Sequence, residues 1–297
     1  MLDYPALAAI ASVLREGSFE KAAQALGVTP SAVSQRVRGL EERLGSILII
    51  RGQPCTATET GRALSAHFDR VQLLEADLAP VLMPPGGVGA GAAALRVAVN
   101  SDSLATWFPR AAAAFTQASG VLLDLTVDDE GHTPERLRSG EVLAVVTADP
   151  EPVQGCRTIP LGALQYAACA SPDFVARYFG GGVNADTLAQ APHMRFDSRD
   201  SLQARWVREA HGIALNGPAH RIPSTHGFLD CALAGMAWGL QPLTLVRPHL
   251  EANRLEELEP RQPVSVMLYW TVVRLHASPL RALTDAVRAV AGEMLDT

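Results

Sequence analysis

The stretch from Ser18 to Gly45 constrains the fold of this chain more than any other part of the sequence. Its apolar residues fall into two stripes with helical spacing, and Gly27 separates them, which predicts two helices joined by a tight turn. Thr29 is a favourable N-cap for the second helix, and Pro30 suits its first position, where a backbone N–H would have no partner. The stretch is therefore typical of a helix-turn-helix.

The polar face of the second predicted helix carries the side chains that a DNA major groove would meet. Hydroxyls, an amide and a guanidinium near a helix N-terminus can reach phosphates and base edges. A short hairpin predicted over residues 47–57 would follow this helix as a wing. The candidate DNA-binding residues are Thr29, Ser31, Ser34, Gln35, Arg36, Arg38 and Arg51. A helical hairpin with a solvated polar face would explain the same pattern without any DNA.

The charge of the chain does not by itself point to nucleic acid, because the net charge is −6 and the first 61 residues carry six basic and six acidic side chains. DNA affinity would therefore depend on the local placement of the arginines and on doubling by a dimer. No apolar run approaches the length of about twenty residues that spans a membrane, and the N-terminus lacks the basic region of a signal peptide. We expect a cytoplasmic protein with no membrane partner, and its 297 residues favour two domains or more.

A long helix is predicted after Thr58, with one apolar stripe that resembles a coiled-coil seam. A seam of this length on an otherwise polar helix needs a partner, and we expect a second copy of the chain, although an intrachain core is the alternative. The proposed dimerisation residues are Leu64, Phe68, Val71, Leu74 and Leu78. The Gly- and Pro-rich residues 84–94 contain a G-x-G-x-x-A match, but this match follows a helix and precedes a strand. A flexible hinge is therefore expected there, and not a dinucleotide site.

Predicted strands and helices alternate from residue 95 onward, which indicates a parallel sheet with right-handed crossovers and hence an α/β fold. We expect lobe I at about residues 95–163 and 266–297, and lobe II at about residues 164–265, which includes a predicted helix over residues 227–239. Ligands of open α/β sheets bind beyond the carboxyl ends of the strands. A ligand cleft is therefore expected between the lobes.

The predicted carboxyl ends of these strands carry hydroxyl and carboxylate side chains. Hydroxyls at the start of a helix that Ser101 or Asp102 would cap suit a ligand carboxylate. Acidic residues at neighbouring strand ends suit an ammonium or guanidinium group, so the set fits a small zwitterion with an additional cation. The candidate effector-binding residues are Ser101, Asp102, Ser103, Asp128, Asp129, Glu130, Thr147, Asp197 and His226. Solvated loop acids and helix caps would produce the same pattern without a ligand.

The sequence gives little support for catalysis or metal binding. It contains no G-x-S-x-G, H-E-x-x-H or phosphate-loop motif, and its histidines lack the spacing of metal ligands. The four cysteines are widely separated with no C-x-x-C pair, which favours structural thiols in a reducing compartment. We therefore predict no catalytic residue, no metal site and no cofactor apart from a small-molecule effector.

The pattern S-F-x-x-A-A-x-x-L-x-V-x-x-S-A-V-S-x-x-V-x-x-L-E-x-x-L-G resembles the LysR-type transcriptional regulators. Four further segments are similar to the lysine- and arginine-responsive ArgP/LysG branch of that family, namely NSDSLATW (100–107), ERLRSGEV (135–142), LGAL (161–164) and MLYW (267–270). The resemblance implies a winged helix-turn-helix at 1–58, a linker and dimerisation helix at 59–83, a hinge at 84–94 and a two-lobed, periplasmic-binding-protein-like effector domain at 95–297.

The resemblance also implies the partners of such a regulator. It would act as a homodimer or homotetramer that binds an interrupted palindrome in double-stranded operator DNA and works with RNA polymerase. Its effector would be a small basic amino acid, L-lysine or L-arginine, and its targets would concern amino-acid export or metabolism. Thr56 stands where related proteins often carry a basic residue, which weakens the expected DNA contact of the wing. The alternatives are a regulator that senses another metabolite and a cytoplasmic amino-acid-binding protein; an enzyme of small amino compounds has the least support.

Overall fold

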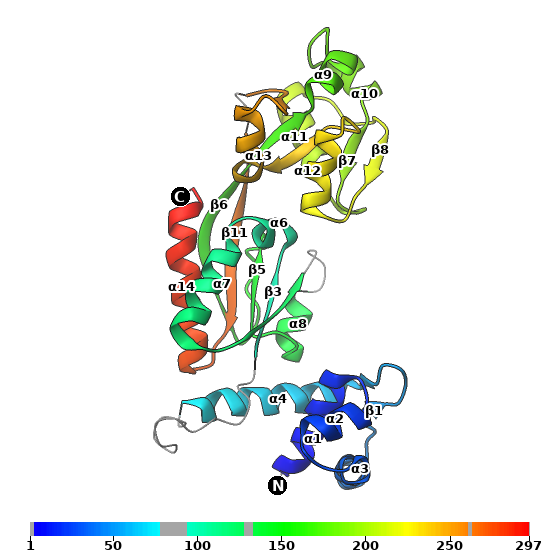
Figure 1. The fold of residues 1–297 in the computed structure, drawn as a ribbon, viewed down its shortest axis with the longest axis vertical. Coiled ribbons are helices and arrows are strands. Elements are labelled where there is room, and N and C mark those ends of the chain that lie inside the picture. Colours follow the sequence, from blue (N-terminus) through cyan, green and yellow to red (C-terminus); the bar gives the residue numbers. More distant parts are fainter. Residues whose placement is uncertain (1–2, 78–93, 128–132, 261–262, 297) are drawn as a thin grey trace.

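The computed structural model describes residues 3–77, 94–127, 133–260 and 263–296. A small helical domain at the N-terminus leads into the long helix α4, and a larger α/β domain with two lobes stands above that helix in Figure 1. The predicted ligand acids Asp128, Asp129 and Glu130 and the predicted seam residue Leu78 lie outside the described residues.

The N-terminal domain consists of three helices and a short hairpin, and the linker helix follows. Its elements are α1 (Tyr4–Glu16), α2 (Phe19–Ala25), α3 (Pro30–Leu44), β1 (Ile49–Ile50), β2 (Thr56–Ala57) and α4 (Glu59–Ala76). Glycines in the left-handed conformation follow α1 at Gly17 and α3 at Gly45, where any other side chain would be strained. Strand β1 pairs antiparallel with β2, which gives the expected wing. The predicted helix-turn-helix is confirmed.

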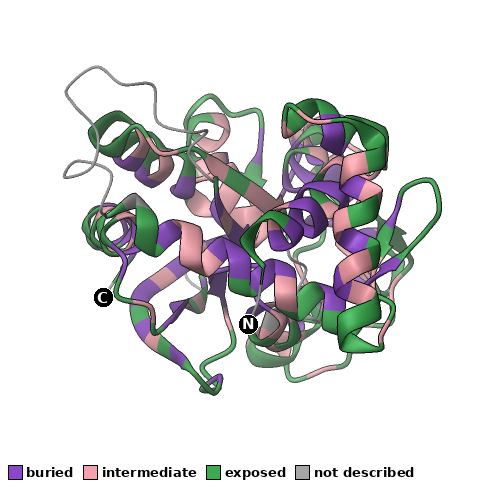
Figure 2. Cartoon of the chain, turned by 90° about the horizontal axis from the view of Figure 1, so that it is seen from below, coloured by how far each residue is buried: buried purple, intermediate pink, exposed green. Residues whose placement is uncertain are grey.

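Side-chain caps fix the starts of α2 and α3. The Ser18 hydroxyl accepts a hydrogen bond from the backbone N–H of Lys21, and the Thr29 hydroxyl accepts one from that of Ala32, both at 3.2 Å. The apolar faces of α1, α2 and α3 then close a small core. Figure 2 shows the buried residues of the helices in purple and their exposed residues in green. The helices are therefore held by amphipathic packing, with capping at their ends.

Helix α4 divides its apolar side chains between two cores. Leu64 packs against the core of the N-terminal domain, and Phe68 lies inside that core with its ring edge-on to Tyr4. Leu73 is buried in the core of the α/β domain. The expectation that the whole stripe faces a partner chain is therefore corrected at Phe68, because α1 of the same chain already covers this residue. Leu74 is 42% exposed and remains available for a partner.

The α/β domain is built on one mixed sheet with the strand order β10–β6–β11–β5–β3–β4, in which β9 also pairs with β6. The strands are β3 (Leu95–Val99), β4 (Leu123–Val127), β5 (Ala144–Thr147), β6 (Cys156–Ala170), β9 (Gly239–Pro242), β10 (Glu256–Glu257) and β11 (Val264–Val273). Strand β3 pairs parallel with β4 and β5, as the alternation predicted. The expectation of a wholly parallel sheet is wrong, because the long strands β6 and β11 run antiparallel to each other between the lobes (Figure 1).

Helices cover the sheet of lobe I and make up much of lobe II. They are α6 (Ser101–Ala105), α7 (Phe108–Ser119), α8 (Thr133–Ser139), α9 (Pro172–Tyr178), α10 (Ala185–Gln190), α11 (Leu202–His211), α12 (Thr225–Leu233), α13 (Leu243–Glu251) and α14 (Ser278–Met294). A small parallel pair, β7 (His193–Arg195) and β8 (Ala219–Arg221), lies beside α12 in lobe II.

Two predicted helix boundaries are corrected by local geometry. The N-cap of α6 is Asn100, and not Ser101 or Asp102, because the Asn100 side chain accepts the backbone N–H of Ser103. The helix expected over residues 227–239 is too long. It ends at Leu233, since Gly235 adopts a positive φ of 70°, and strand β9 begins at Gly239.

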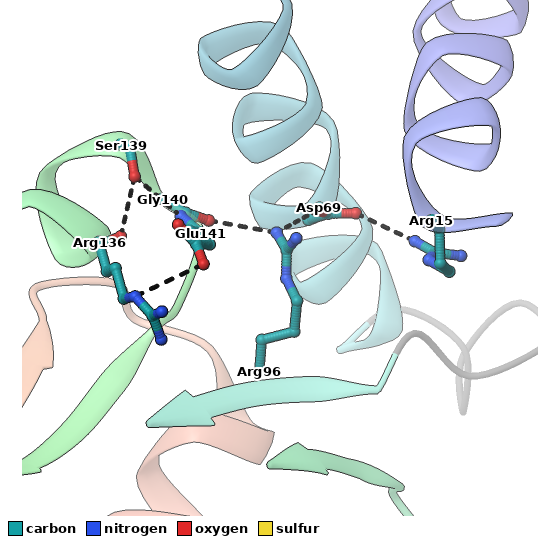
Figure 3. Close-up of polar contacts among 7 residues, drawn as sticks. All are labelled: Arg15, Asp69, Arg96, Arg136, Ser139, Gly140 and Glu141. Carbon is teal, nitrogen blue, oxygen red and sulfur yellow. Dashed lines mark hydrogen bonds and ion pairs between the residues drawn. The ribbon is translucent and has the colours of Figure 1, made fainter. Parts of the chain in front are cut away.

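A chain of polar contacts joins the N-terminal domain to the α/β domain through α4 (Figure 3). The Asp69 carboxylate of α4 lies 3.3 Å from Arg15 of α1 and accepts a second contact from Arg96 of β3. Arg96 also donates to the backbone carbonyl of Gly140, 3.1 Å away and just after α8. Gly140 has a positive φ, and a Cβ there would overlap the Cβ of Ala66 on α4. Glycine therefore permits the close approach of this loop to the linker helix.

Candidate functional site

A cavity of about 280 Å³ lies between the two lobes, where α6, α11 and α12 begin. A cavity of this size fits a small metabolite better than a large ligand. Its wall combines apolar side chains such as Phe228 and Leu240 with a ring of polar groups from both lobes. The polar residues of the wall are Asn100, Ser101, Asp102, Tyr166, Asp197, Arg199, Asp200, Ser201, Gln203, Arg205, Thr225 and Gln241.

The Asp102 carboxylate is held between the lobes by hydroxyl groups. The Tyr166 hydroxyl donates to Oδ2 and the Thr225 hydroxyl donates to Oδ1, each at 2.6 Å. The Ser101 hydroxyl lies 2.9 Å from that of Thr225 and can donate to it in turn. Burial raises the pKa of Asp102 above its ordinary value, against the lowering effect of the two hydroxyls, and the nearby charge of Asp200 adds to the rise. No ion pair to Asp102 occurs among the described residues.

The two other acids of the cavity wall are occupied within their own loop. Asp197 forms an ion pair with Arg199 at 3.2 Å and accepts the backbone N–H groups of Arg199 and Asp200. Burial would raise the pKa of Asp197, but the hydrogen bonds from Arg199 outweigh it and lower this pKa. Asp200 accepts the backbone N–H groups of Phe196 and Leu202. Asp102 is therefore the wall acid whose hydrogen-bond partners, within the described residues, are neutral hydroxyls from other elements.

The structure brings some of the sequence-predicted ligand residues together and leaves others apart. Ser101, Asp102 and Asp197 line the cavity. Ser103 is fully buried and Thr147 is nearly so, and neither contributes to the cavity wall. His226 is exposed and also lies outside the wall, since its neighbour Thr225 takes the inward position at the start of α12. Ser103, Thr147 and His226 therefore lie outside the wall of this cavity, and their role as effector contacts stays a prediction.

Sequence reasoning did not include most of the polar residues of the cavity wall among the candidate ligands, and four of these omissions matter most for the site. Tyr166 and Gln241 lie in strands β6 and β9, and Gln203 and Thr225 lie in the first turns of α11 and α12. Polar residues at predicted strand ends and helix starts were the available signal for three of them. Tyr166 carried no such signal, because it lies within the continuous strand β6 and reaches Asp102 only through the tertiary fold.

Metal binding and membrane insertion find no support in the described parts of the chain. Within residues 3–77, 94–127, 133–260 and 263–296, no group of His, Cys, Asp and Glu side chains is placed to hold a metal ion. Over the same residues, the helices are all too short or too polar to cross a membrane.

The outer face of α3 presents the predicted DNA-reading side chains. The apolar side chains of Val33, Val37 and Leu40 are buried in the domain core, so the opposite face is free. The candidate residues that are exposed are Thr29, Ser31, Gln35, Arg38 and Arg51, and those that are half-buried are Ser34 and Arg36. The face therefore has the composition and exposure that a major-groove helix requires.

Two of the candidate arginines are already positioned by neighbouring side chains. Arg38 donates to Glu42 one turn later on α3 at 3.0 Å, and both side chains are exposed. The guanidinium of Arg51 in the wing lies over the ring of Phe19, 4.9 Å from its centre. An exposed i,i+4 pair of this kind is weak, so a phosphate can replace Glu42 as the partner of Arg38.

Comparison with known proteins gives consistent matches over the whole chain. The family model for the bacterial regulatory helix-turn-helix protein, lysR family, matches residues 5–62, and that for the LysR substrate binding domain matches residues 89–295. The HTH-type transcriptional regulator ArgP of Pseudomonas aeruginosa (strain UCBPP-PA14) is 42% identical over 295 residues, which cover 99% of this chain and 98% of that protein.

Two solved structures are similar along the full length. The crystal structure of ArgP from Mycobacterium tuberculosis has 38% sequence identity and a TM-score of 0.81, and the match covers 100% of this chain and 99% of that one. The full-length LysG of Corynebacterium glutamicum with bound effector Arg has 36% identity and a TM-score of 0.72, with both chains covered completely.

Proposed function

Since the chain belongs to the LysR-type transcriptional regulators, we propose that its inter-lobe cavity binds a small basic amino acid, L-arginine or L-lysine, and thereby controls genes of amino-acid export or metabolism. Relatives named ArgP and LysG, one of them solved with Arg bound, support this choice of effector. The protein is a DNA-binding regulator by family, and the exposed face of α3 is the surface that would read the operator.

The single observation that carries the effector proposal is the environment of Asp102. Its carboxylate lies in the cavity wall, accepts only hydroxyl hydrogen bonds in the described part of the chain, and has a raised pKa because of burial. A buried carboxylate without a counter-charge is unfavourable, and a ligand cation would remove that penalty. A metabolite without a cationic group would not, and a basic amino acid supplies a side-chain cation in addition to its α-ammonium, so the cavity favours such an amino acid.

The hydrogen bonds of Thr225 indicate how binding would change the protein. This residue belongs to α12 of lobe II, whereas Asp102 and Ser101 belong to α6 of lobe I. A ligand ammonium or guanidinium beside Asp102 would compete with, or add to, this contact across the cleft. Effector binding would therefore alter how firmly the lobes are held together, which is the change that a regulator must transmit to its DNA-binding domain.

The remaining parts of the proposal follow from the family. The regulator would act in the cytoplasm as a homodimer or homotetramer, on an interrupted palindrome in double-stranded DNA, together with RNA polymerase. It would need no cofactor apart from its effector and would catalyse no reaction. Two copies of α3 should then meet half-sites about one helical turn apart, or a multiple of that.

A thermal-shift panel of the twenty amino acids, followed by a gel shift on DNA from the region upstream of its own gene, tests the proposal. A ligand at a hundredfold excess over its dissociation constant stabilises the folded protein by about 2.7 kcal/mol. We expect a rise in melting temperature with arginine or lysine, and retarded DNA.

Two other outcomes would overturn parts of the proposal. A shift with a neutral or acidic metabolite alone would overturn the choice of effector. A ligand-induced rise in melting temperature without any retarded DNA would instead favour an amino-acid-binding protein that does not bind operator DNA.

A further inference from the structure

Two buried glutamines in lobe II face the cavity without a hydrogen-bond partner among the described residues. Gln241, on β9, is 1% exposed, and neither its amide oxygen nor its amide nitrogen has a partner there. Gln203, in the first turn of α11, is 2% exposed, and its amide oxygen Oε1 also has no hydrogen-bond partner among the described residues. Asp102 of lobe I supplies a carboxylate to the same cavity.

Buried amides of this kind are uncommon because they give up water without gaining a partner. A leucine of similar size would pack at either position without that penalty. The amides therefore become favourable only when something in the cavity supplies the missing hydrogen bonds. A ligand with several N–H donors does so for the two amide oxygens.

The charge of the wall decides which donor group fits best. The wall contains Asp197 paired with Arg199, and Arg205 paired with Glu209. Asp102, in contrast, has no ion pair among the described residues and can accept a ligand cation. The two amides add hydrogen-bond acceptors but no further charge. An ammonium is a compact, strongly hydrated ion with three donors. Neutral amide oxygens compensate poorly for the water that such an ion loses on binding. A guanidinium is more weakly hydrated and spreads five donors over a plane, so that carboxylate and amide oxygens can share it.

We infer that Gln203 and Gln241 contact the effector side chain and set a preference for the guanidinium of arginine over the ammonium of lysine. This inference rests on the proposed function and deepens it. The two glutamines act as specificity-determining residues, while Asp102 selects for positive charge as such.

Titration calorimetry of the full-length protein with arginine and with lysine tests the inference. The probes are Gln241→Leu and Gln203→Leu, singly and together, with Gln190→Leu as the matched control, since Gln190 is exposed at the end of α10 and lies outside the cavity wall. We expect wild type and the control to prefer arginine. The double variant should lose about tenfold or more in arginine affinity but less than about threefold in lysine affinity, because only the guanidinium loses acceptors that it needs.

The melting temperature without effector separates this role from a structural one. If the amides serve the ligand, Gln241→Leu leaves the effector-free melting temperature unchanged or raises it, because an unpartnered polar group has been removed. A lower effector-free melting temperature with an intact arginine preference would assign Gln241 to packing and overturn the inference. Equal losses for arginine and lysine would overturn it as well. Binding of neither amino acid to the wild type would instead reject the proposed function itself.

Discussion

The Arg96 guanidinium donates to the Asp69 carboxylate at 2.5 Å, across the junction between the α/β domain and the linker helix. Burial raises the pKa of Asp69, although the charges of Arg96 and Arg15 act to lower it. Arg96 belongs to β3, a strand of five residues whose far end leads directly into Asn100 and α6 at the cavity. One short strand thus connects the candidate effector site with the helix that carries the DNA-binding domain.

Replacing Arg96 with methionine should destabilise the protein by roughly 1–3 kcal/mol, because it leaves the buried Asp69 carboxylate with only one cationic partner. The raised folded-state pKa means that stability falls as the pH rises from the ordinary pKa of an aspartate through the raised value, and the loss of Arg96 raises that pKa further, so the deficit should grow as the pH rises over this range. Thermal unfolding as a function of pH measures it.

Arg110→Met is the control for Arg96→Met, because the Arg110–Glu293 pair is exposed on both sides and should contribute less than about 1 kcal/mol. If the two variants unfold alike at every pH, the contact between Arg96 and Asp69 has no special role at the junction.

Arginine affinity should depend on pH through Asp102. A bound cation favours the ionised carboxylate, whereas burial raises its pKa in the free protein, so binding releases a proton when the pH lies below that pKa. The dissociation constant should then rise by up to about tenfold for each unit of pH decrease below the raised value. Titration calorimetry in buffers of different ionisation enthalpy reports both the affinity and the proton release. Asp102→Asn should bind weakly and show a flat profile; a wild-type profile that is equally flat would remove Asp102 as the cation partner.

Alanine at Gln35 or Arg38 should weaken binding to the operator by roughly 1–3 kcal/mol if these side chains read base edges. Arg38 has first to leave Glu42, but that exposed pair is weak. Fluorescence anisotropy with labelled operator DNA gives the affinities, and Gln190→Ala in lobe II serves as the control. Operator affinity equal to the parent for both variants would show that α3 reads DNA through other residues.

Lysine at Leu74 should weaken self-association, because this residue is an exposed member of the predicted seam in the described part of α4. Analytical ultracentrifugation measures the change, and operator affinity should fall with it. Met236→Lys, a charge at an exposed apolar residue of lobe II, is the control. A Leu74→Lys protein that sediments like the parent would exclude the linker helix from the interface.

The sequence was sufficient for features that depend on neighbouring residues. Thr29 and Gly45 mark the ends of α3 through their own backbone preferences, and the apolar spacing between them defines the buried face. The alternation of strands and helices likewise predicted the parallel core around β3. Asn100 shows the limit of such reasoning, since three neighbouring polar residues could each have capped α6, and only the geometry selected one.

Features that join distant segments could not be predicted. Tyr166 and Thr225 reach Asp102 from 64 and 123 residues away, and no local pattern encodes those separations. Phe68 belongs to a stripe that fits a dimer seam and an intrachain core equally well, and its burial against α1 depends on how α4 packs. The antiparallel course of β11 follows from the return of the chain out of lobe II, which its strand pattern alone does not reveal.

Titration of the full-length protein with arginine, lysine and citrulline tests most directly whether the cavity recognises a cation. Citrulline keeps the length and shape of arginine but replaces the guanidinium with a neutral urea group. We expect arginine or lysine to bind, and citrulline to bind at least about 100-fold more weakly than arginine, because it leaves a buried carboxylate without its counter-charge. Asp102→Asn should remove most of that difference. Citrulline that binds the wild type as tightly as arginine would contradict a cation-selective effector site at Asp102.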